Sequence, residues 1–226
     1  MEVKLISYSQ INKEVFGDTD VKNIEDIVAY CARVSNPSNQ DNTETNEKLL
    51  KYLIREKHWS PFEMVNVCLE ITTTRDIARQ ILRHRSFSFQ EFSQRYANPL
   101  DDLKSVRREA RLQDTKNRQN SIDTDDNALQ QSWNGQQDLV WLAAVKAYNW
   151  AIDRGIAKEQ ARAVLPEGLI ESRVYVNGTL RSWLHYIDLR EKNGTQKEHM
   201  EIARACADVI TKIFPMGDTY LAPSKR

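Results

Sequence analysis

The chain has 226 residues, and its 32 lysines and arginines balance its 32 aspartates and glutamates, so the net charge is zero. This length suffices for one domain with a substantial core, and we expect residues 1–226 to form it. A neutral chain argues against a protein that coats nucleic acid or an anionic membrane surface, because both functions need a basic excess.

The chain also lacks the sequence signs of export and metal binding. No apolar run approaches the ~20 residues that span a bilayer, and residues 1–5 show no apolar core of a signal peptide. The three cysteines, Cys31, Cys68 and Cys206, are far apart and odd in number. They suggest neither a disulfide framework nor a zinc site, so we expect a cytoplasmic protein without a bound metal.

Apolar periodicity predicts the elements of the first half of the chain. The clearest is a half-buried strand at 64–72, where Val65, Val67, Leu69 and Ile71 alternate with polar neighbours. A helix at 73–82 follows, with a threonine cap and an apolar stripe. The other elements predicted before residue 97 are a strand at 1–7, a helix at 21–35, a polar loop at 36–46 and a helix at 45–57.

The second half opens with a polar stretch. Residues from about 100 to 136 are rich in Asn, Gln, Asp and Ser, which indicates an exposed insertion. After it we predict helices at 137–154, 157–165, 180–190 and 198–214, a strand at 170–176, a turn at 177–179 and a tail at 215–226. Trp133, Trp141 and Trp150 are expected to serve packing. These elements predict an α+β fold, a single domain whose mixed or antiparallel sheet is flanked by long helices.

Residues 83–95 form the most informative stretch of the chain. They contain three arginines, a histidine, a glutamate and three serines, with aromatic residues between them and no lysine or glycine. Planar guanidinium groups bind phosphates and carboxylates through two hydrogen bonds and stack on flat rings. The stretch therefore indicates a site for an anionic ligand that contains a ring. An arginine-rich surface with ordinary ion pairs explains the composition equally well.

Two further classes of protein compete with a small-molecule site. Arginines interleaved with Phe87, Phe89, Phe92 and Tyr96 could stack nucleic-acid bases. The zero net charge and the absence of a basic stripe elsewhere count against that class. The third class is a helical assembly protein without chemistry.

The motif Arg83-His84-Arg85, followed after seven residues by Ser93, resembles the signature of the flavin-dependent thymidylate synthases. Other blocks of the chain resemble segments of that family in the same order. They are residues 31–35, 58–63, 78–80, 161–166, 177–183 and 189–190, so that the resemblance covers roughly residues 25–205.

The resemblance implies a fold like that of the thymidylate synthase complementing proteins, and a reaction. Such enzymes methylate dUMP to dTMP, with 5,10-methylenetetrahydrofolate as the carbon donor and NADPH as the reductant through bound FAD. No Gly-x-Gly-x-x-Gly loop is present to hold phosphates, so arginines and backbone amides must do so. The resemblance also implies a homotetramer with shared active sites, and no nucleic-acid or membrane partner.

The resemblance assigns site residues one by one. It places dUMP against Gln80, Ile81, Leu82, Arg83, Glu91, Phe92, Ser93, Gln94, Arg95, Arg162 and Arg190. It places FAD against Ser60, Arg83, His84, Arg85, Glu91, Thr179, Leu180, Arg181 and His185, with His58 near the flavin and the folate.

We expect Arg190 to be the catalytic residue of this set. A guanidinium that donates to the N3/O2 edge of uracil stabilises negative charge on the ring and stays protonated at neutral pH. Ser93 is a weaker candidate as a nucleophile, because no neighbouring base is evident to activate it. The flavin carries the redox chemistry in the family, so no covalent protein nucleophile is required.

Overall fold

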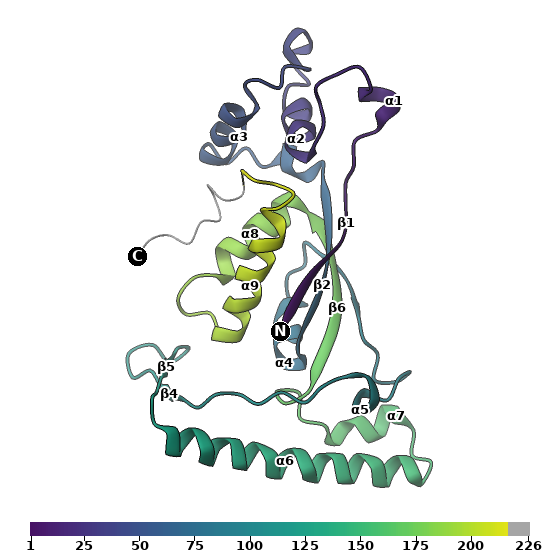
Figure 1. Ribbon diagram of the computed structural model, residues 1–226, viewed down its shortest axis with the longest axis vertical. Coiled ribbons are helices and arrows are strands. Elements are labelled where there is room, and N and C mark those ends of the chain that lie inside the picture. Colours follow the sequence, from purple (N-terminus) through teal and green to yellow (C-terminus); the bar gives the residue numbers. More distant parts are fainter. Residues whose placement is uncertain (217–226) are drawn as a thin grey trace.

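The computed structural model describes residues 1–216 and is built around one four-stranded sheet (Figure 1). The strand order is β1 (Glu2–Tyr8), β2 (Asn66–Thr74), β6 (Glu171–Thr179) and β3 (Ser88–Glu91). All neighbouring strands in it are antiparallel. The predicted α+β fold with an antiparallel sheet is therefore confirmed.

Two helices cover one face of the sheet (Figure 1). Helix α8 (Leu180–Arg190) follows β6 without a break, and α9 (Lys197–Ile210) packs beside it. Alternate residues of β2, among them Val67, Leu69 and Ile71, are fully buried in the core. Trp183 of α8 is also fully buried, and its Nε1–H donates to the carbonyl of Val67 at 2.9 Å. The indole thus ties α8 to the central strand.

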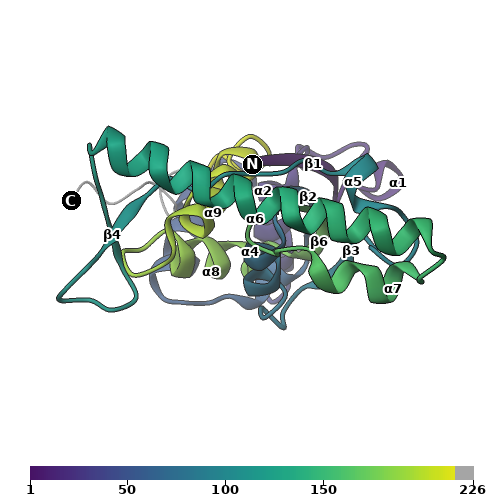
Figure 2. The same ribbon diagram turned by 90° about the horizontal axis from the view of Figure 1, so that it is seen from below.

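The remaining helices lie at the two ends of the sheet. At one end, α2 (Ile24–Ala32) packs against α3 (Asn46–Arg55), near the short α1 (Lys13–Phe16). Helix α4 (Arg75–Ile81) continues directly from β2. At the opposite end, α6 (Asn127–Asp153) runs across the molecule with α7 (Lys158–Ala161) and α5 (Pro99–Asp102) near it (Figure 2). The remaining short elements are 3₁₀ turns at Pro37–Asn39, Ser60–Glu63 and Arg162–Val164, and a hairpin of β4 (Arg111–Gln113) and β5 (Ser121–Asp123).

Helix α6 begins ten residues earlier than the sequence predicts. It starts at Asn127, where the side chain of Asp126 accepts from the backbone N–H of Leu129 at 2.9 Å, and not at residue 137. Most side chains in the predicted insertion at 100–136 are exposed, but the stretch is not irregular throughout. It contains the β4–β5 hairpin and the first turns of α6.

Two glutamines of α6 explain why its polar first turns fold. The side chain of Gln130 bonds both the N–H and the carbonyl of Ala110, at 2.8 and 2.9 Å. Gln137 bonds the N–H and the carbonyl of Arg108 at the same two distances. The amides thus replace the backbone of a neighbouring strand, and the helix is held by polar contacts where the sequence shows no apolar stripe.

The turn predicted at 177–179 is also wrong, because these residues extend β6 to its end. Gly178 lies opposite Val67 in the sheet, and a Cβ added there would come within 2.4 Å of Phe87 Cδ1. The glycine therefore serves the close approach of an aromatic ring, and Thr179 starts α8 by capping its first turn.

Two smaller expectations also differ from the structure. Trp141 packs against the smaller apolar cluster as predicted, whereas Trp133 and Trp150 are 42% and 52% exposed and lie outside both apolar clusters of the described residues. Of the predicted tail, Met216 is buried and its N–H donates to Glu25 at 2.7 Å, while residues 217–226 lie outside the described part. No helix formed by residues 1–216 has the length and apolar character to cross a membrane.

Candidate active site

Helix α8 brings Arg190 to the histidine of the arginine motif. The Nε–H of Arg190 donates to Nε2 of His84 at 2.9 Å, although 106 positions separate the two residues. Burial, followed by the charges of Arg190 and Arg83, lowers the pKa of His84 from 6.5 to about 4. His84 is therefore neutral at pH 7, with its proton on Nδ1. It orients the guanidinium of Arg190 through this hydrogen bond and adds no second positive charge beside it.

A second histidine lies behind this pair. His199 of α9 is completely buried, with Nδ1 at 3.1 Å from Oε1 of Gln80 and Nε2 at 3.1 Å from the hydroxyl of Tyr186. The ring of Tyr186 also packs edge-on against His84, with centroids 4.9 Å apart. Burial, then the charges of Arg190 and His84, lower the pKa of His199 to about 3. Gln80 belongs to the predicted nucleotide set, whereas His199 was not assigned.

Three arginines, a glutamine and a glutamate line a polar cavity of about 360 Å³ between α4 and the segment 162–167. Its polar lining comes from Arg75, Arg79, Gln94, Arg162 and Glu167. Gln94 is 3% exposed, and its Nε2 has no hydrogen-bond partner among residues 1–216. Several guanidinium groups and an unpaired amide donor facing one cavity suit a phosphate. The structure thus brings together Gln94 and Arg162, both predicted to contact the nucleotide.

Arg75 is a member of this cavity that the sequence reasoning missed. Its Nη1 lies 3.3 Å from Oε1 of Glu91, and its Nε lies 3.3 Å from Oε1 of Glu167. Arg79 approaches the same two carboxylates at 3.5 and 3.6 Å. A signal was present in the sequence, because Arg75 directly precedes the apolar stripe of this helix, and a buried arginine needs an anionic partner.

A second cavity, of about 310 Å³, lies along β3 and the residues after it. Glu91, Phe92 and Ser93 of the predicted nucleotide set line it, together with Tyr175 and with Tyr96, which is 88% exposed. Aromatic rings beside a serine hydroxyl suit a flat, polar ring. The predicted nucleotide residues therefore line two cavities within one chain, with Ser93 in one and Arg162 in the other.

The predicted FAD residues divide into exposed cations and structural residues. Arg83 and Arg85 are exposed and form no ion pair with any carboxylate of residues 1–216. Guanidinium groups so free suit the diphosphate of a dinucleotide. Thr179 accepts from the N–H of Ser182 at 3.2 Å, and the side chain of Leu180 is fully buried, so both side chains serve the fold of α8.

The remaining FAD residues gather at the first turns of α8. Nη1 of Arg181 donates to Glu63 at 2.5 Å, and the ring of His185 packs edge-on against Trp59 with centroids 4.5 Å apart. Burial, then the charge of Arg181, lowers the pKa of His185. Ser60 begins the 3₁₀ turn that carries Glu63.

Three predicted residues lie at the edges of these groups. His58 is exposed, with its ring 5.8 Å from that of Tyr52. Arg95 pairs with Glu159 at 3.2 Å. Of the two apolar residues predicted to contact the nucleotide, Ile81 is buried in the core and Leu82 packs against it. Only the backbone of Ile81 can therefore reach a ligand.

The protein has an α+β fold, and its two cavities offer arginines, an amide donor and aromatic rings, which suit phosphorylated, ring-containing compounds. Residues 18–216 match the family described as "Thymidylate synthase complementing protein", and the chain belongs to that family. This confirms the family resemblance that the Arg83-to-Ser93 motif indicates.

Curated relatives and solved structures agree with this assignment. A flavin-dependent thymidylate synthase from Synechocystis is 49% identical over 95% of this chain and 96% of its own length. A protein of Paramecium bursaria Chlorella virus 1, named "Probable flavin-dependent thymidylate synthase", is 48% identical over the same shares. The UMP/dUMP methylase PolB of Streptomyces cacaoi, solved with 5-Br dUMP, has a TM-score of 0.75. It covers 97% of this chain and 93% of its own at 22% identity, so it supports the fold alone.

Proposed function

We propose that this protein is a flavin-dependent thymidylate synthase. It converts dUMP to dTMP, taking the carbon from 5,10-methylenetetrahydrofolate and the reducing equivalents from NADPH through bound FAD. The observation that carries the proposal is the contact between Arg190 and His84, because it places a fixed cation beside the arginine motif. The whole chain acts as one catalytic domain. The family match supports this, because it spans residues 18–216.

The phosphate of dUMP binds in the polar cavity of Arg75, Gln94 and Arg162. The free Nε2 of Gln94 supports this placement, because a buried amide without a partner costs free energy until a ligand accepts its hydrogen bond. In the structure, the carboxylate of Glu167 pairs with Arg75 in this cavity. A bound phosphate would compete with Glu167 for the guanidinium of Arg75. Ser93 and the backbone after Glu91 hold the sugar and the ring.

FAD would supply the chemistry of hydride and one-carbon transfer when bound. The residues that would hold it are the free guanidinium groups of Arg83 and Arg85, with Arg181, His185 and Ser60 at the start of α8. Arg83 and Arg85 support this proposal because neither pairs with a carboxylate within residues 1–216. Arg181 and His185 support it because they lie together beside Glu63 and Trp59. His58 is exposed two residues before Ser60, and we place it beside the flavin and the folate.

Arg190 acts on the uracil ring. Its Nε is held by His84, and its Nη groups have no hydrogen-bond partner among residues 1–216, so both can donate to the N3/O2 edge of the base. Charge that develops on the ring is then stabilised by a guanidinium that needs no reorganisation, and one such donor is worth about 3 kcal/mol in the transition state. Because His84 is neutral, the full positive charge of Arg190 faces the base.

The enzyme is a homotetramer whose active sites use more than one chain. Exposed apolar side chains on α6, such as Leu139, Val140 and Leu142, support association, since monomers rarely leave such residues uncovered along one helix. Light scattering would contradict this state if the active species had the mass of a monomer.

An anaerobic assay tests the function directly. Purified protein loaded with FAD is reduced with NADPH, mixed with 5,10-methylenetetrahydrofolate and dUMP, and analysed for dTMP. Arg190→Ala is expected to retain FAD absorbance but to abolish dUMP-dependent oxidation of the flavin. A protein that stays colourless at saturating FAD would refute the proposal, and full activity of Arg190→Ala would remove Arg190 from the mechanism.

A further inference from the structure

His199 is a buried histidine that the proposed reaction does not use. Its ring lies in the core on α9 and both ring nitrogens are hydrogen-bonded, one to Gln80 and the other to Tyr186. Burial next to Arg190 and His84 keeps the ring uncharged, with a pKa lowered to about 3. An uncharged histidine can bond two partners only if one ring nitrogen donates and the other accepts.

The partners of Gln80 decide which nitrogen donates. Nε2 of Gln80 donates to Oε1 of Gln196 at 2.8 Å, so the other end of the Gln80 amide is the acceptor Oε1. The atom of His199 that faces Oε1 is Nδ1, which must therefore carry the proton. Nε2 of His199 then accepts from the hydroxyl of Tyr186. Each hydrogen in this series of hydrogen bonds, from Gln196 through Gln80 and His199 to Tyr186, therefore has one possible place.

The charge of Glu198 fixes the other end of this series of hydrogen bonds, at Gln196. Nε2 of Gln196 donates to Glu198 at 3.0 Å, and Glu198 is held by Arg108 and Arg111. Gln196 must therefore present its Oε1 to Gln80. The Gln80 amide is thus held from both sides, and its second N–H has no acceptor in the described part of the chain.

We propose that His199 is a positioning residue for the nucleotide. By holding Oε1 of Gln80, it prevents the amide from turning over, so that Gln80 presents an N–H donor to the nucleotide and never its carbonyl oxygen. This inference rests on the proposed function, which places Gln80 against dUMP. The ligand group that meets Gln80 is consequently an acceptor, such as a carbonyl of the base or an oxygen of the sugar or phosphate.

Three substitutions at one position test the role of the Nδ1 proton. The side-chain amide of Asn reaches the place of Nδ1, whereas that of Gln reaches the place of Nε2. His199→Asn therefore keeps the donor to Gln80, while His199→Gln and His199→Phe lose it. The Kd of dUMP is measured by calorimetry on the FAD-loaded full chain, together with KM and kcat.

We expect His199→Gln and His199→Phe to raise the Kd and KM for dUMP about tenfold, the equivalent of one lost hydrogen bond, with kcat little changed. His199→Asn should restore the affinity to within about threefold of the starting protein. In a Gln80→Leu background, His199→Phe should add nothing, because the group that His199 holds is gone. Equal loss in all three variants, or an added loss in that background, would overturn the inference.

Tyr186→Phe provides a second, conservative probe. It keeps the ring that packs on His84 but removes the hydroxyl that donates to Nε2 of His199, while Gln196 and Glu198 still direct Oε1 of Gln80 towards Nδ1. The affinity for dUMP should therefore stay within about threefold of the starting protein, and a loss of about tenfold would contradict the inference. Failure of the unmodified FAD-loaded protein to bind dUMP would instead contradict the proposed function, so the two failures are distinguishable.

Discussion

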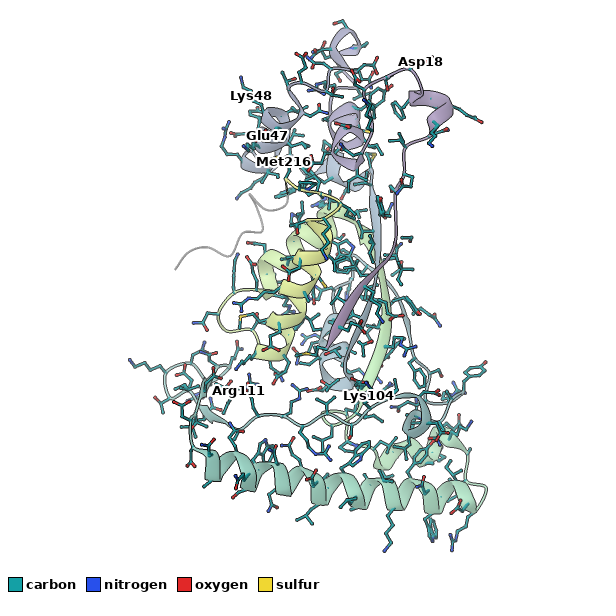
Figure 3. All side chains as sticks on the ribbon, viewed as in Figure 1. Asp18, Glu47, Lys48, Lys104, Arg111 and Met216 are labelled. Atoms are coloured by element: carbon teal, nitrogen blue, oxygen red, sulfur yellow. The ribbon has the colours of Figure 1, made fainter. Side chains whose placement is uncertain are left out.

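Glu198 offers a quantitative test of the ion-pair network that holds Gln196, the hydrogen-bond partner of Gln80. It is 8% exposed at the start of α9, where its Oε1 accepts from Nη2 of Arg111 at 2.5 Å and its Oε2 lies 2.9 Å from Nη1 of Arg108. Arg108 also pairs with Asp76 at 2.7 Å. Figure 3 shows Arg111 in the segment between α9 and α6. Glu198→Gln preserves the size of the side chain but removes its charge.

The expected loss of stability can be obtained in two ways. Burial by itself would raise the pKa of Glu198, but the hydrogen bonds from Arg111 and from its own backbone, with the charges of Arg108 and Arg111, outweigh burial and lower it from 4.5 to about 2. At 1.36 kcal/mol per pKa unit, this difference is worth about 3 kcal/mol. Removing one partner of a buried ion pair costs about 3–5 kcal/mol. We therefore expect Glu198→Gln to lower the free energy of unfolding by about 3 kcal/mol at pH 7.

The same reasoning fixes how the effect depends on pH. Because the pKa is lower in the folded chain, the stabilisation by Glu198 is complete above pH 4.5 and is lost as the pH falls towards 2. The difference between the two proteins should therefore shrink on acidification.

Urea unfolding at a fixed protein concentration and saturating FAD measures these free energies. Asp188→Asn is the matched control, because Asp188 pairs with Lys192 at 2.8 Å on an exposed surface. It should cost about 0.5 kcal/mol or less. The reasoning is refuted if Glu198→Gln costs no more than this control at pH 7.

Three further predictions follow from the site and the sheet. His84→Phe should lower kcat by about 10- to 100-fold at saturating FAD, because it removes a charge-assisted hydrogen bond to Arg190. His84→Gln keeps an acceptor and should lower kcat less; equal kcat values for the two variants would exclude this role of His84. Gly178→Ala should cost about 1–3 kcal/mol in a urea titration, because Phe87 packs against the place of the new methyl group; an unchanged midpoint would contradict the close contact. The free energy of unfolding should fall as the pH drops from 6.5 towards 4, because the unfolded chain binds protons that the buried His84 and His199 exclude; a flat profile in that range would show that these histidines are charged when folded.

The strength of the sequence prediction varied with the kind of contact that holds each element. Strand β2 was predicted correctly because its alternating apolar residues meet one core, and α8 because its apolar stripe repeats every three to four residues. The first turns of α6 were missed because Gln130 and Gln137 hold them through hydrogen bonds to a distant backbone. No local sequence pattern predicts hydrogen bonds from a side chain to a distant backbone.

The candidate site shows the same division. The sequence singled out the arginine motif by its composition, and the family resemblance added Arg162 and Arg190, because the chemistry of anion binding limits the residue types that can serve. Arg75 was missed, and its role follows from the cavity that it shares with Gln94. His199 was left without a role, since nothing in the residues around it indicates that it bonds Gln80.

The sequence by itself thus determined the family, the α+β class and the supply of guanidinium groups, because all three depend on residue types and local periodicity. Only the tertiary structure decided that Arg190 bonds His84 and that Gln94 keeps a free donor in the cavity of Arg162. The physical reason is that a hydrogen bond works over about 3 Å. Atoms from remote parts of the chain come that close only after the register of the sheet and the packing of α8 and α9 are set.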